Sequence, residues 1–361
     1  MIRILHGADF HLDSPFAALG REQAAQRREE QRQLIRRLGE VCAKRDCQLL
    51  LLAGDLFDSD FVYRETTELL REVLAGLRAR VFIAPGNHDP WSDRSPYAAV
   101  SWPENVHIFR SRTVETVRLE DPAVTVYGAA FMDARSRGML TDFRADSSDA
   151  ASVMVLHGTL GDPASPYNPI SDREVLEAGL DYLALGHIHK QELRRIGDAT
   201  VGNPGCAMGR GFDETGPKGV LYVELEGGSC RAEPVNLGAR VYESLTLLAG
   251  NDPLKAIEAL LPADTRRDIY RITLTGSCPP PDLRALYEAL SGRFYALELA
   301  DRTLPPPELW RDAAEDSLKG EFLRRLQSCF AEAPDEDSKR LAAEAARLGL
   351  ALMEQREVPE L

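Results

Sequence analysis

Six short apolar runs recur along the first half of the chain, and most of them end at a glycine or a histidine. They are rich in Leu, Val and Ile and span residues 2–5, 49–53, 81–84, 124–127, 153–156 and 182–185. Apolar runs without alternation are typical of strands that are buried on both faces. Residues 21–44, 65–77 and 172–178 show helical spacing between several of the runs. This alternation of strand and helix predicts an α/β sheet.

Side chains that can bind metals or transfer protons follow these runs closely. In chain order they are Asp9, His11, Asp55, Asn87, His88, His157, His187 and His189. Five of the chain's seven histidines belong to this set, whereas histidines that merely fill a core would be scattered. In open α/β sheets, ligands bind outside the carboxyl ends of the strands, so we expect these side chains to form one site.

The donor atoms in this set are carboxylate and amide oxygens and imidazole nitrogens, without sulfur. That mixture suits Mn²⁺, Fe or Zn²⁺ better than Cu(I) or an iron–sulfur cluster. Eight candidates are too many for a single tetrahedral metal with an open position. Two metals that share a carboxylate would use them, and such a pair, roughly 3.5–4 Å apart, can generate a hydroxide nucleophile for displacement at phosphorus.

The order and type of these motifs resemble the calcineurin-like metallophosphoesterase superfamily. The motifs are Asp9-Phe10-His11, Gly54-Asp55, Gly86-Asn87-His88-Asp89, His157-Gly158 and Gly186-His187-Ile188-His189. The residues around them resemble the SbcD-type DNA repair exonuclease branch of that superfamily. They include Leu12-Asp13-Ser14-Pro15-Phe16, Leu56-Phe57-Asp58, Asn203-Pro204-Gly205, Gly209-Arg210-Gly211 and Gly216-Pro217-Lys218-Gly219.

The resemblance implies a role for each matching residue. One metal would be held by Asp9, His11 and His189, the other by Asn87, His157 and His187, with Asp55 bridging the two. His88 would face the substrate, either as general acid to the leaving alkoxide or as a stabiliser of charge on the phosphate. Asp58 would orient His88 and keep it protonated.

The resemblance also implies a four-layer α/β/β/α sandwich, which we expect over residues 1–238. A change of pattern near residue 241 predicts strands at 242–248, 269–274 and 294–299, with helices at 252–260 and 282–290. We interpret residues 239–304 as a small α/β capping domain. Residues 305–361 would form C-terminal helices, near 308–332 and 337–357, that dock back or bind a partner.

The function implied is a dinuclear-metal phosphodiesterase, an exonuclease or endonuclease of DNA repair that works with an SMC-like coiled-coil ATPase. We expect two divalent ions, Mn²⁺ foremost, with Mg²⁺, Fe and Zn²⁺ as alternatives, and leave a homodimer open. One alternative is another metallophosphoesterase that acts on a nucleotide or cyclic nucleotide ester, because the metal core does not define the leaving group. A non-catalytic scaffold for a repair ATPase is an alternative of a different class.

Charge and composition constrain the setting. A net charge of −14 argues against nucleic-acid binding through a broad basic surface, although two divalent ions would add positive charge where phosphate binds. Six cysteines without a C-x-x-C pair fit a reducing compartment. We expect a cytoplasmic protein without a secretory signal or membrane span, because the start lacks a signal-type apolar segment and no apolar run approaches about 18 residues.

Overall fold

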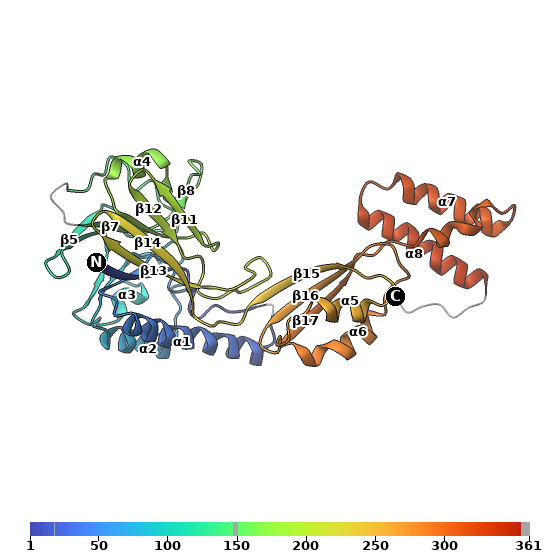
Figure 1. Cartoon of the computed structure of the whole chain (residues 1–361), viewed down its shortest axis with the longest axis horizontal. Coiled ribbons are helices and arrows are strands. Elements are labelled where there is room, and N and C mark those ends of the chain that lie inside the picture. Colours follow the sequence, from blue (N-terminus) through green and yellow to red (C-terminus); the bar gives the residue numbers. More distant parts are fainter. Residues whose placement is uncertain (18, 147–150, 355–361) are drawn as a thin grey trace. The chain divides into compact units, whose positions relative to one another are not determined.

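The computed structural model describes residues 1–17, 19–146 and 151–354. It divides into two compact units, Met1–Val241 and Tyr242–Leu361 (Figure 1). Within the described ranges, none of the helices combines the length and the apolar character that crossing a bilayer requires.

The first unit contains two six-stranded sheets. In spatial order, the first sheet consists of β14 (Ser229–Asn236), β13 (Gly219–Glu226), β1 (Ile2–Gly7), β2 (Leu49–Leu52), β3 (Arg80–Ile83) and β4 (Val106–Ile108). The second consists of β11 (Glu192–Ile196), β12 (Ala199–Asn203), β10 (Tyr182–Gly186), β7 (Ser152–His157), β6 (Val124–Gly128) and β5 (Glu115–Leu119). In the first sheet, β1 to β4 pair in parallel, and the antiparallel strands β13 and β14 lie beside β1. In the second sheet, β12, β10, β7 and β6 pair in parallel, and the antiparallel strands β11 and β5 form the two edges.

The two sheets pack face to face, and helices cover their outer faces. The shared buried cluster includes Ile4, Leu49, Leu51, Phe82, Val126, Val153, Val155, Tyr182 and Ala184. Helices α1 (Arg21–Lys44) and α2 (Arg64–Ala75) pack on the outer face of the first sheet, and α4 (Asp172–Ala178) packs on that of the second (Figure 1). These layers confirm the predicted α/β/β/α sandwich.

Local sequence explains why these elements form. In β2, Leu49 and Leu51 point into the space between the sheets, and Leu50 and Leu52 point toward the helices, as the two-residue period of a strand requires. Helix α4 begins at a capping box in which Ser171 and Glu174 satisfy each other's backbone N–H groups. A short parallel pair, β8 (Thr159–Leu160) and β9 (Pro169–Ile170), precedes this helix in the chain.

The second unit is built on a parallel sheet of β15 (Tyr242–Leu248), β16 (Ile269–Thr275) and β17 (Ala296–Asp301). Helices α5 (Pro253–Leu260) and α6 (Leu283–Leu290) pack on this sheet through a common apolar cluster. Helices α7 (Leu318–Glu332) and α8 (Glu336–Met353) form a second cluster around Leu323 and Ala346. Arg340 on α8 donates a hydrogen bond of 2.7 Å to the Asp301 carbonyl.

All six strands predicted in the first half are present, whereas edge strands such as β5, β11 and β14 were not predicted because their sequences are largely polar. The helix predicted at 308–332 divides into a 3₁₀ helix, Pro307–Ala314, and α7, because the Ser317 hydroxyl caps α7 by accepting from the Gly320 N–H. The end predicted for the last helix, at 357, lies outside the described residues. The structure places residues 242–354 in one unit, and their division into a capping domain and a partner-binding segment stays a prediction.

Candidate metal centre

The carboxyl ends of parallel strands from both sheets meet at one edge of the sandwich. Asp9, Asp55 and Asn87 follow β1, β2 and β3, while His157 ends β7 and His187 follows β10. Hydrogen bonds join the two sheets at this edge. The His187 N–H donates to both carboxylate oxygens of Asp9, at 3.1 and 2.9 Å, and the His157 Nδ1–H donates to the Ala53 carbonyl at 2.9 Å.

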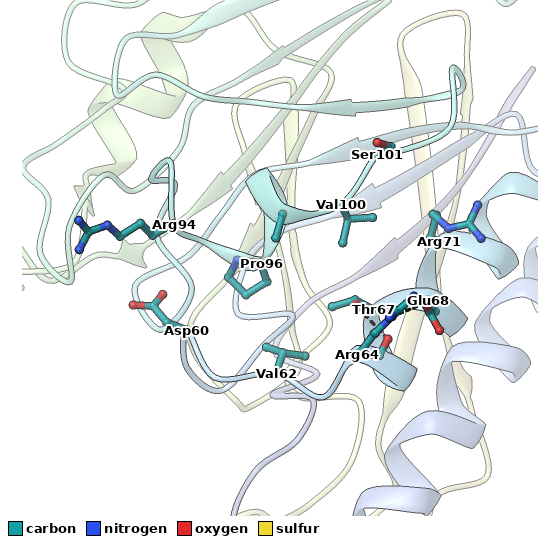
Figure 2. A pocket seen from close by; sticks show the side chains of 11 residues that line it. Asp60, Val62, Arg64, Thr67, Glu68, Arg71, Arg94, Pro96, Val100 and Ser101 are labelled. Atoms are coloured by element: carbon teal, nitrogen blue, oxygen red, sulfur yellow. Dashed lines mark hydrogen bonds and ion pairs between the residues drawn. The ribbon is translucent and has the colours of Figure 1, made fainter.

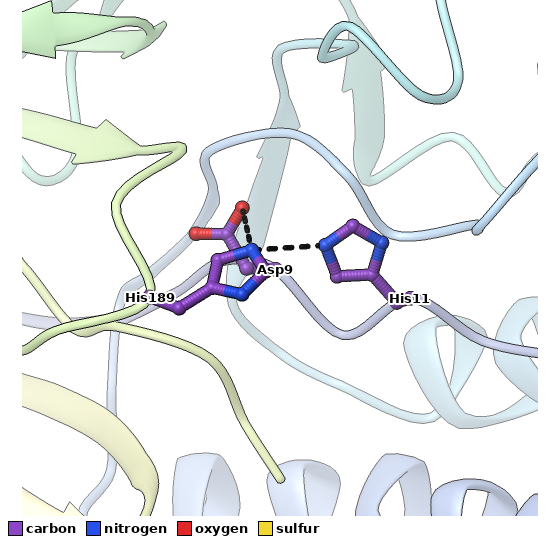
Figure 3. Close-up of side chains that lie close together, drawn as sticks. All are labelled: Asp9, His11 and His189. Carbon is purple, nitrogen blue, oxygen red and sulfur yellow. Dashed lines mark hydrogen bonds and ion pairs between the residues drawn. The ribbon is translucent and has the colours of Figure 1, made fainter. Parts of the chain in front are cut away.

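Asp9, His11 and His189 form the first cluster of donor atoms (Figure 3). The Nε2 atoms of His11 and His189 lie 3.1 Å apart, and His189 Nε2 lies 3.8 Å from Asp9 Oδ1. On the far side of each ring, Nδ1 faces a carboxylate: Asp58 at 3.0 Å for His11 and Glu214 at 2.5 Å for His189. Since carboxylates only accept, each Nδ1 carries the proton and the two Nε2 atoms are left to act as ligands.

Asn87, His157 and His187 form the second cluster. The Asn87 Oδ1 atom lies 2.9 Å from His157 Nε2 and 3.0 Å from His187 Nδ1. Because Nδ1 of His157 already donates to a backbone carbonyl, its Nε2 is the free ligand atom. An amide oxygen and two ring nitrogens therefore converge on a second point.

Asp55 lies between the two clusters. Its Oδ2 atom is 3.8 Å from His11 Nε2 and 3.4 Å from His157 Nε2, so one carboxylate oxygen reaches toward both groups of donors. Its Oδ1 atom accepts a hydrogen bond of 2.9 Å from the His88 N–H. The glycine before Asn87 keeps this arrangement open, because a Cβ on Gly86 would collide with the Asp55 carboxylate.

Four of these residues have backbone conformations that side chains rarely adopt. Asp9, His11, Asp55 and His187 have φ values of 52°, 45°, 50° and 103°. Non-glycine residues in this region cost of order 1–3 kcal/mol each and persist where the surrounding structure holds them. Strain held at several residues of one cluster is typical of a functional site.

Burial and the nearby carboxylates shift the pKa values of the histidines of the centre in different directions. Burial lowers the pKa of His11, and it lowers the pKa of His187 to about 4, so both rings stay neutral as ligands require. At His157 burial also opposes charge, but the neighbouring Asp55 carboxylate outweighs it and raises the pKa of His157 to about 9. The carboxylates thus favour a positive charge at His157.

The Asp58 carboxylate has other partners than the sequence expectation named. The Asp58 carboxylate contacts His11 and Arg210, at 3.0 and 2.9 Å, rather than the His88 ring. His88 instead directs its Nδ1 toward the Asp58 backbone carbonyl at 3.2 Å, and its ring is exposed beside His11. Asp58 therefore touches His88 only through its backbone.

Glu214, Arg210 and Asp89 also build the site, and sequence reasoning missed the parts that Glu214 and Arg210 play. Burial disfavours charge on Glu214, but its hydrogen bond with His189 and the charge of Arg210 lower its pKa to about 2. The buried Asp89 carboxylate accepts from the N–H groups of Asp55, Phe57 and Gly86 and from the Tyr97 hydroxyl. The glycine-rich segment 205–219 was noted in the sequence, but its single glutamate carried no motif.

The donor set fits divalent metal ions. With the proton on Nδ1, neutral His11 and His189 would direct the lone pairs of their Nε2 atoms toward each other across 3.1 Å. Two such atoms are suited to bind one cation. The second cluster of Asn87 Oδ1 with two ring nitrogens has the same character. Within the described ranges, every candidate cluster of metal-binding side chains lies in the first unit.

Comparison with known proteins agrees with this chemistry. A model of the calcineurin-like phosphoesterase family matches residues 2–191. The uncharacterized metallophosphoesterase YhaO of Bacillus subtilis is 30% identical over 244 residues, which cover 64% of this chain and 59% of YhaO. The SbcD component of the nuclease SbcCD from B. subtilis is 24% identical over 270 residues, covering 63% of this chain and 67% of that protein.

The DNA double-strand break repair protein Mre11 of Methanopyrus kandleri is 24% identical over 253 residues, covering 63% of this chain and 55% of that protein. The chain thus spans only slightly more than half the length of YhaO and of this Mre11. The family model covers more than half of the chain and includes all seven predicted metal ligands. The chain therefore belongs to the calcineurin-like phosphoesterase family.

Proposed function

We propose that the chain is a two-metal phosphodiesterase that cleaves DNA, as a nuclease that acts on DNA ends. The observation that carries this proposal is the convergence of two donor groups on either side of Asp55, whose Oδ2 lies within 3.8 Å of a histidine from each. Family membership supports phosphoester hydrolysis. The names of two similar proteins, a nuclease component and a DNA double-strand break repair protein, favour DNA as the substrate.

The proposed ligands divide into two sets. Asp9, His11 and His189 would hold one ion and Asn87, His157 and His187 the other, with Asp55 between them. Two divalent ions held there, Mn²⁺ in our proposal, would activate a water molecule and stabilise charge on the phosphate oxygens. Asp58 and Glu214 keep the Nε2 atoms of His11 and His189 directed at the first ion by accepting from their Nδ1–H groups.

His88 is the proposed group for proton transfer or charge stabilisation at the leaving oxygen. Its ring is exposed, whereas the other histidines of the centre are buried or half-buried. Its Nδ1–H donates to the Asp58 carbonyl at 3.2 Å, so its Nε2 atom is left to face a substrate. A general acid or a hydrogen-bond donor at that position would assist departure of the alkoxide.

A panel of substrates with added Mn²⁺ tests the function. Linear duplex DNA, single-stranded DNA, a cyclic nucleotide and a phosphomonoester would be compared, with the His88→Gln variant as a matched background control. We expect cleavage of DNA, about two metal ions per chain by elemental analysis, and loss of cleavage after metal removal. Cleavage of the cyclic nucleotide alone would instead support the nucleotide-ester alternative, and bound metal without any hydrolysis would support a scaffold.

The partner in this proposal is an SMC-like coiled-coil ATPase in the cytoplasm. An acidic chain gains DNA affinity by sharing the contact with a partner. On the C-terminal helices, Leu318, Leu341 and Leu352 expose large apolar side chains. Replacing Leu341 and Leu352 together by Glu should abolish co-purification with the ATPase and leave hydrolysis by the isolated chain unchanged; retained association would contradict the proposed docking segment.

A further inference from the structure

The loop of residues 59–63 joins the metal centre to α2 and carries the most exposed large apolar side chain that the structure describes. Phe61 is 91% exposed, and Tyr63 on the same loop is 55% exposed. A single exposed apolar residue is ordinary on a protein surface. Two aromatic residues on one short loop beside a candidate catalytic centre are a more specific arrangement.

Hydrogen bonds hold both ends of this loop. At its start, the Asp58 N–H donates to the Leu12 carbonyl at 3.2 Å. At its end, the Tyr63 N–H donates to Asp13 Oδ2 at 2.8 Å, and the same carboxylate accepts from the Thr66 hydroxyl at 2.9 Å. The sequence motif that contains Asp13 therefore anchors the loop, and Phe61 projects from between the two anchors.

The loop is close to the candidate metal centre. Asp58 contacts His11 through its carboxylate and His88 through its carbonyl. Phe61 follows Asp58 by three residues, so its Cα lies at most about 11 Å from that of Asp58. The ring of Phe61 is thus within reach of a base in the few nucleotides next to the phosphate at the metals.

Cationic side chains surround the same loop. A pocket of about 590 Å³ is lined by Asp60 and Val62 of the loop, by Arg64 and Arg71 of α2, and by Arg94 (Figure 2). Arg64 pairs with Glu68 at 2.6 Å, whereas within the described ranges the Arg94 guanidinium has no ion pair. Arg71 pairs with Glu72 at 3.7 Å, so among the described residues that line this pocket Arg94 is the arginine without a carboxylate partner.

We propose that this loop binds a single-stranded segment of the nucleic-acid substrate, with the exposed ring of Phe61 stacked on a base close to the cleaved phosphate. The proposal rests on the proposed nuclease function and specifies an unpaired strand as the form of DNA that the site takes. Proteins that bind single strands combine a cationic surface with aromatic side chains on which bases stack. The aromatic loop and the arginine-lined pocket are such a combination.

Kinetics on two substrates test the role of Phe61. One substrate is a single-stranded oligonucleotide, and the other is bis(p-nitrophenyl) phosphate, a diester without a nucleobase. Phe61→Ala should raise KM for the oligonucleotide about 5- to 100-fold, the range for loss of one stacked base. The kcat/KM for bis(p-nitrophenyl) phosphate and the metal content should stay at wild-type values, and Phe61→Trp should restore the oligonucleotide KM. Tyr287→Ala, which removes an exposed aromatic ring from the second unit, is the matched control and should change neither substrate's kinetics.

An abasic scan distinguishes stacking from a structural effect of the substitution. Removing the base at one position near the cleavage point should raise the oligonucleotide KM of the wild-type chain as much as Phe61→Ala does. In the Phe61→Ala variant, the same removal should raise KM no further. If the abasic position and Phe61→Ala raised KM additively at every position, the stacking role would be overturned. Equal oligonucleotide KM values for wild type and Phe61→Ala would overturn the inference while leaving the nuclease intact.

Failure of the nuclease function itself looks different. A wild-type chain that hydrolyses bis(p-nitrophenyl) phosphate but neither cleaves nor binds oligonucleotides would overturn both proposals. If Phe61→Ala instead weakened only the association with a protein partner, the loop would be a protein-docking surface and the inference would be wrong.

Discussion

Both units of the chain contain parallel strands followed by helices, but the residues at their strand ends differ. In the first unit, carboxylates, an asparagine and histidines follow β1, β2, β3, β7 and β10 and converge. In the second unit, Asp252 follows β15, but its side chain accepts from the Lys255 N–H and caps α5. Asp301 ends β17 and accepts from the Thr303 N–H. These aspartates stabilise local backbone.

The difference shows what a parallel sheet contributes to a site. The fold brings strand ends together in both units, but only the first unit places several metal donors there. All seven histidines of the chain lie before residue 190, so the second unit has none. The proposed function therefore depends on the residues at the strand ends of the first unit, because the strand-and-helix architecture is common to both units.

The largest effect should come from removing the charge between the two donor clusters. Asp55→Asn should lower hydrolysis about 10⁴-fold or more and reduce the bound metal, because the Asp55 carboxylate faces donors of both clusters. Turnover and elemental analysis measure the two effects. Asp252→Asn is the matched control in the second unit, and it should retain full activity because asparagine also caps helices. An active Asp55→Asn variant with two metals would remove Asp55 from its proposed position.

A smaller effect is expected for the exposed histidine of the centre. His88→Gln should lower kcat by about 10²- to 10⁴-fold, the usual contribution of a positioned proton donor, while metal content stays unchanged. His107→Gln, at a half-buried histidine of β4, should leave kcat unchanged. If His88→Gln lost metal together with activity, His88 would be a ligand and its proposed role would be wrong.

Much of the first unit could be predicted from the sequence, since the short apolar runs and the residues after them carry strong local signals. The buried strands and the clustering of the seven predicted ligands followed from that pattern, and the resemblance of the motifs implied the sandwich. The polar edge strands could not be predicted, because β14 is stabilised by pairing with β13 rather than by its own composition.

The hydrogen-bond partners of the site residues also could not be predicted from spacing along the chain. Glu214 is 25 positions from His189, and only the fold brings their side chains to 2.5 Å. For Asp58, its position three residues after Asp55 favoured a contact with His88, but the carboxylate turns toward His11 and Arg210. Hydrogen-bond partners of this kind depend on side-chain direction, which spacing along the chain does not specify.

Substitution of Glu214 tests whether its contact with His189 supports metal binding. Glu214→Gln removes the charged acceptor from His189 Nδ1, and loss of such a contact to a metal ligand lowers metal affinity or activity about 10- to 100-fold. Activity measured against Mn²⁺ concentration should show a raised metal requirement with recovery at high Mn²⁺. Glu226→Gln, at an exposed glutamate on β13, is the control. An unchanged metal requirement in Glu214→Gln would mean that His189 needs no carboxylate partner.

The smallest effect concerns stability and again separates the two units. Burial lowers the pKa of His6 in β1 to about 3, against an opposing contribution from the Leu185 backbone, whereas the ring titrates near 6.5 when unfolded. Below pH 6.5 the unfolded chain therefore binds a proton that the folded chain does not, and stability is lost as pH falls. The loss is about 1.4 kcal/mol per pH unit, or about 2 kcal/mol at pH 5 relative to pH 7.

Hydrogen exchange can measure this loss in each unit, after correction for the pH dependence of intrinsic exchange. Amides of β1 should lose protection between pH 7 and pH 5, and His6→Gln should remove about 2 kcal/mol of that loss. Amides of β16 should lack this contribution, because their unit contains no histidine. The same pH dependence in β1 of wild type and His6→Gln would show that His6 does not cause it. The two units would then differ in their candidate catalytic residues but not through this effect of His6 on stability.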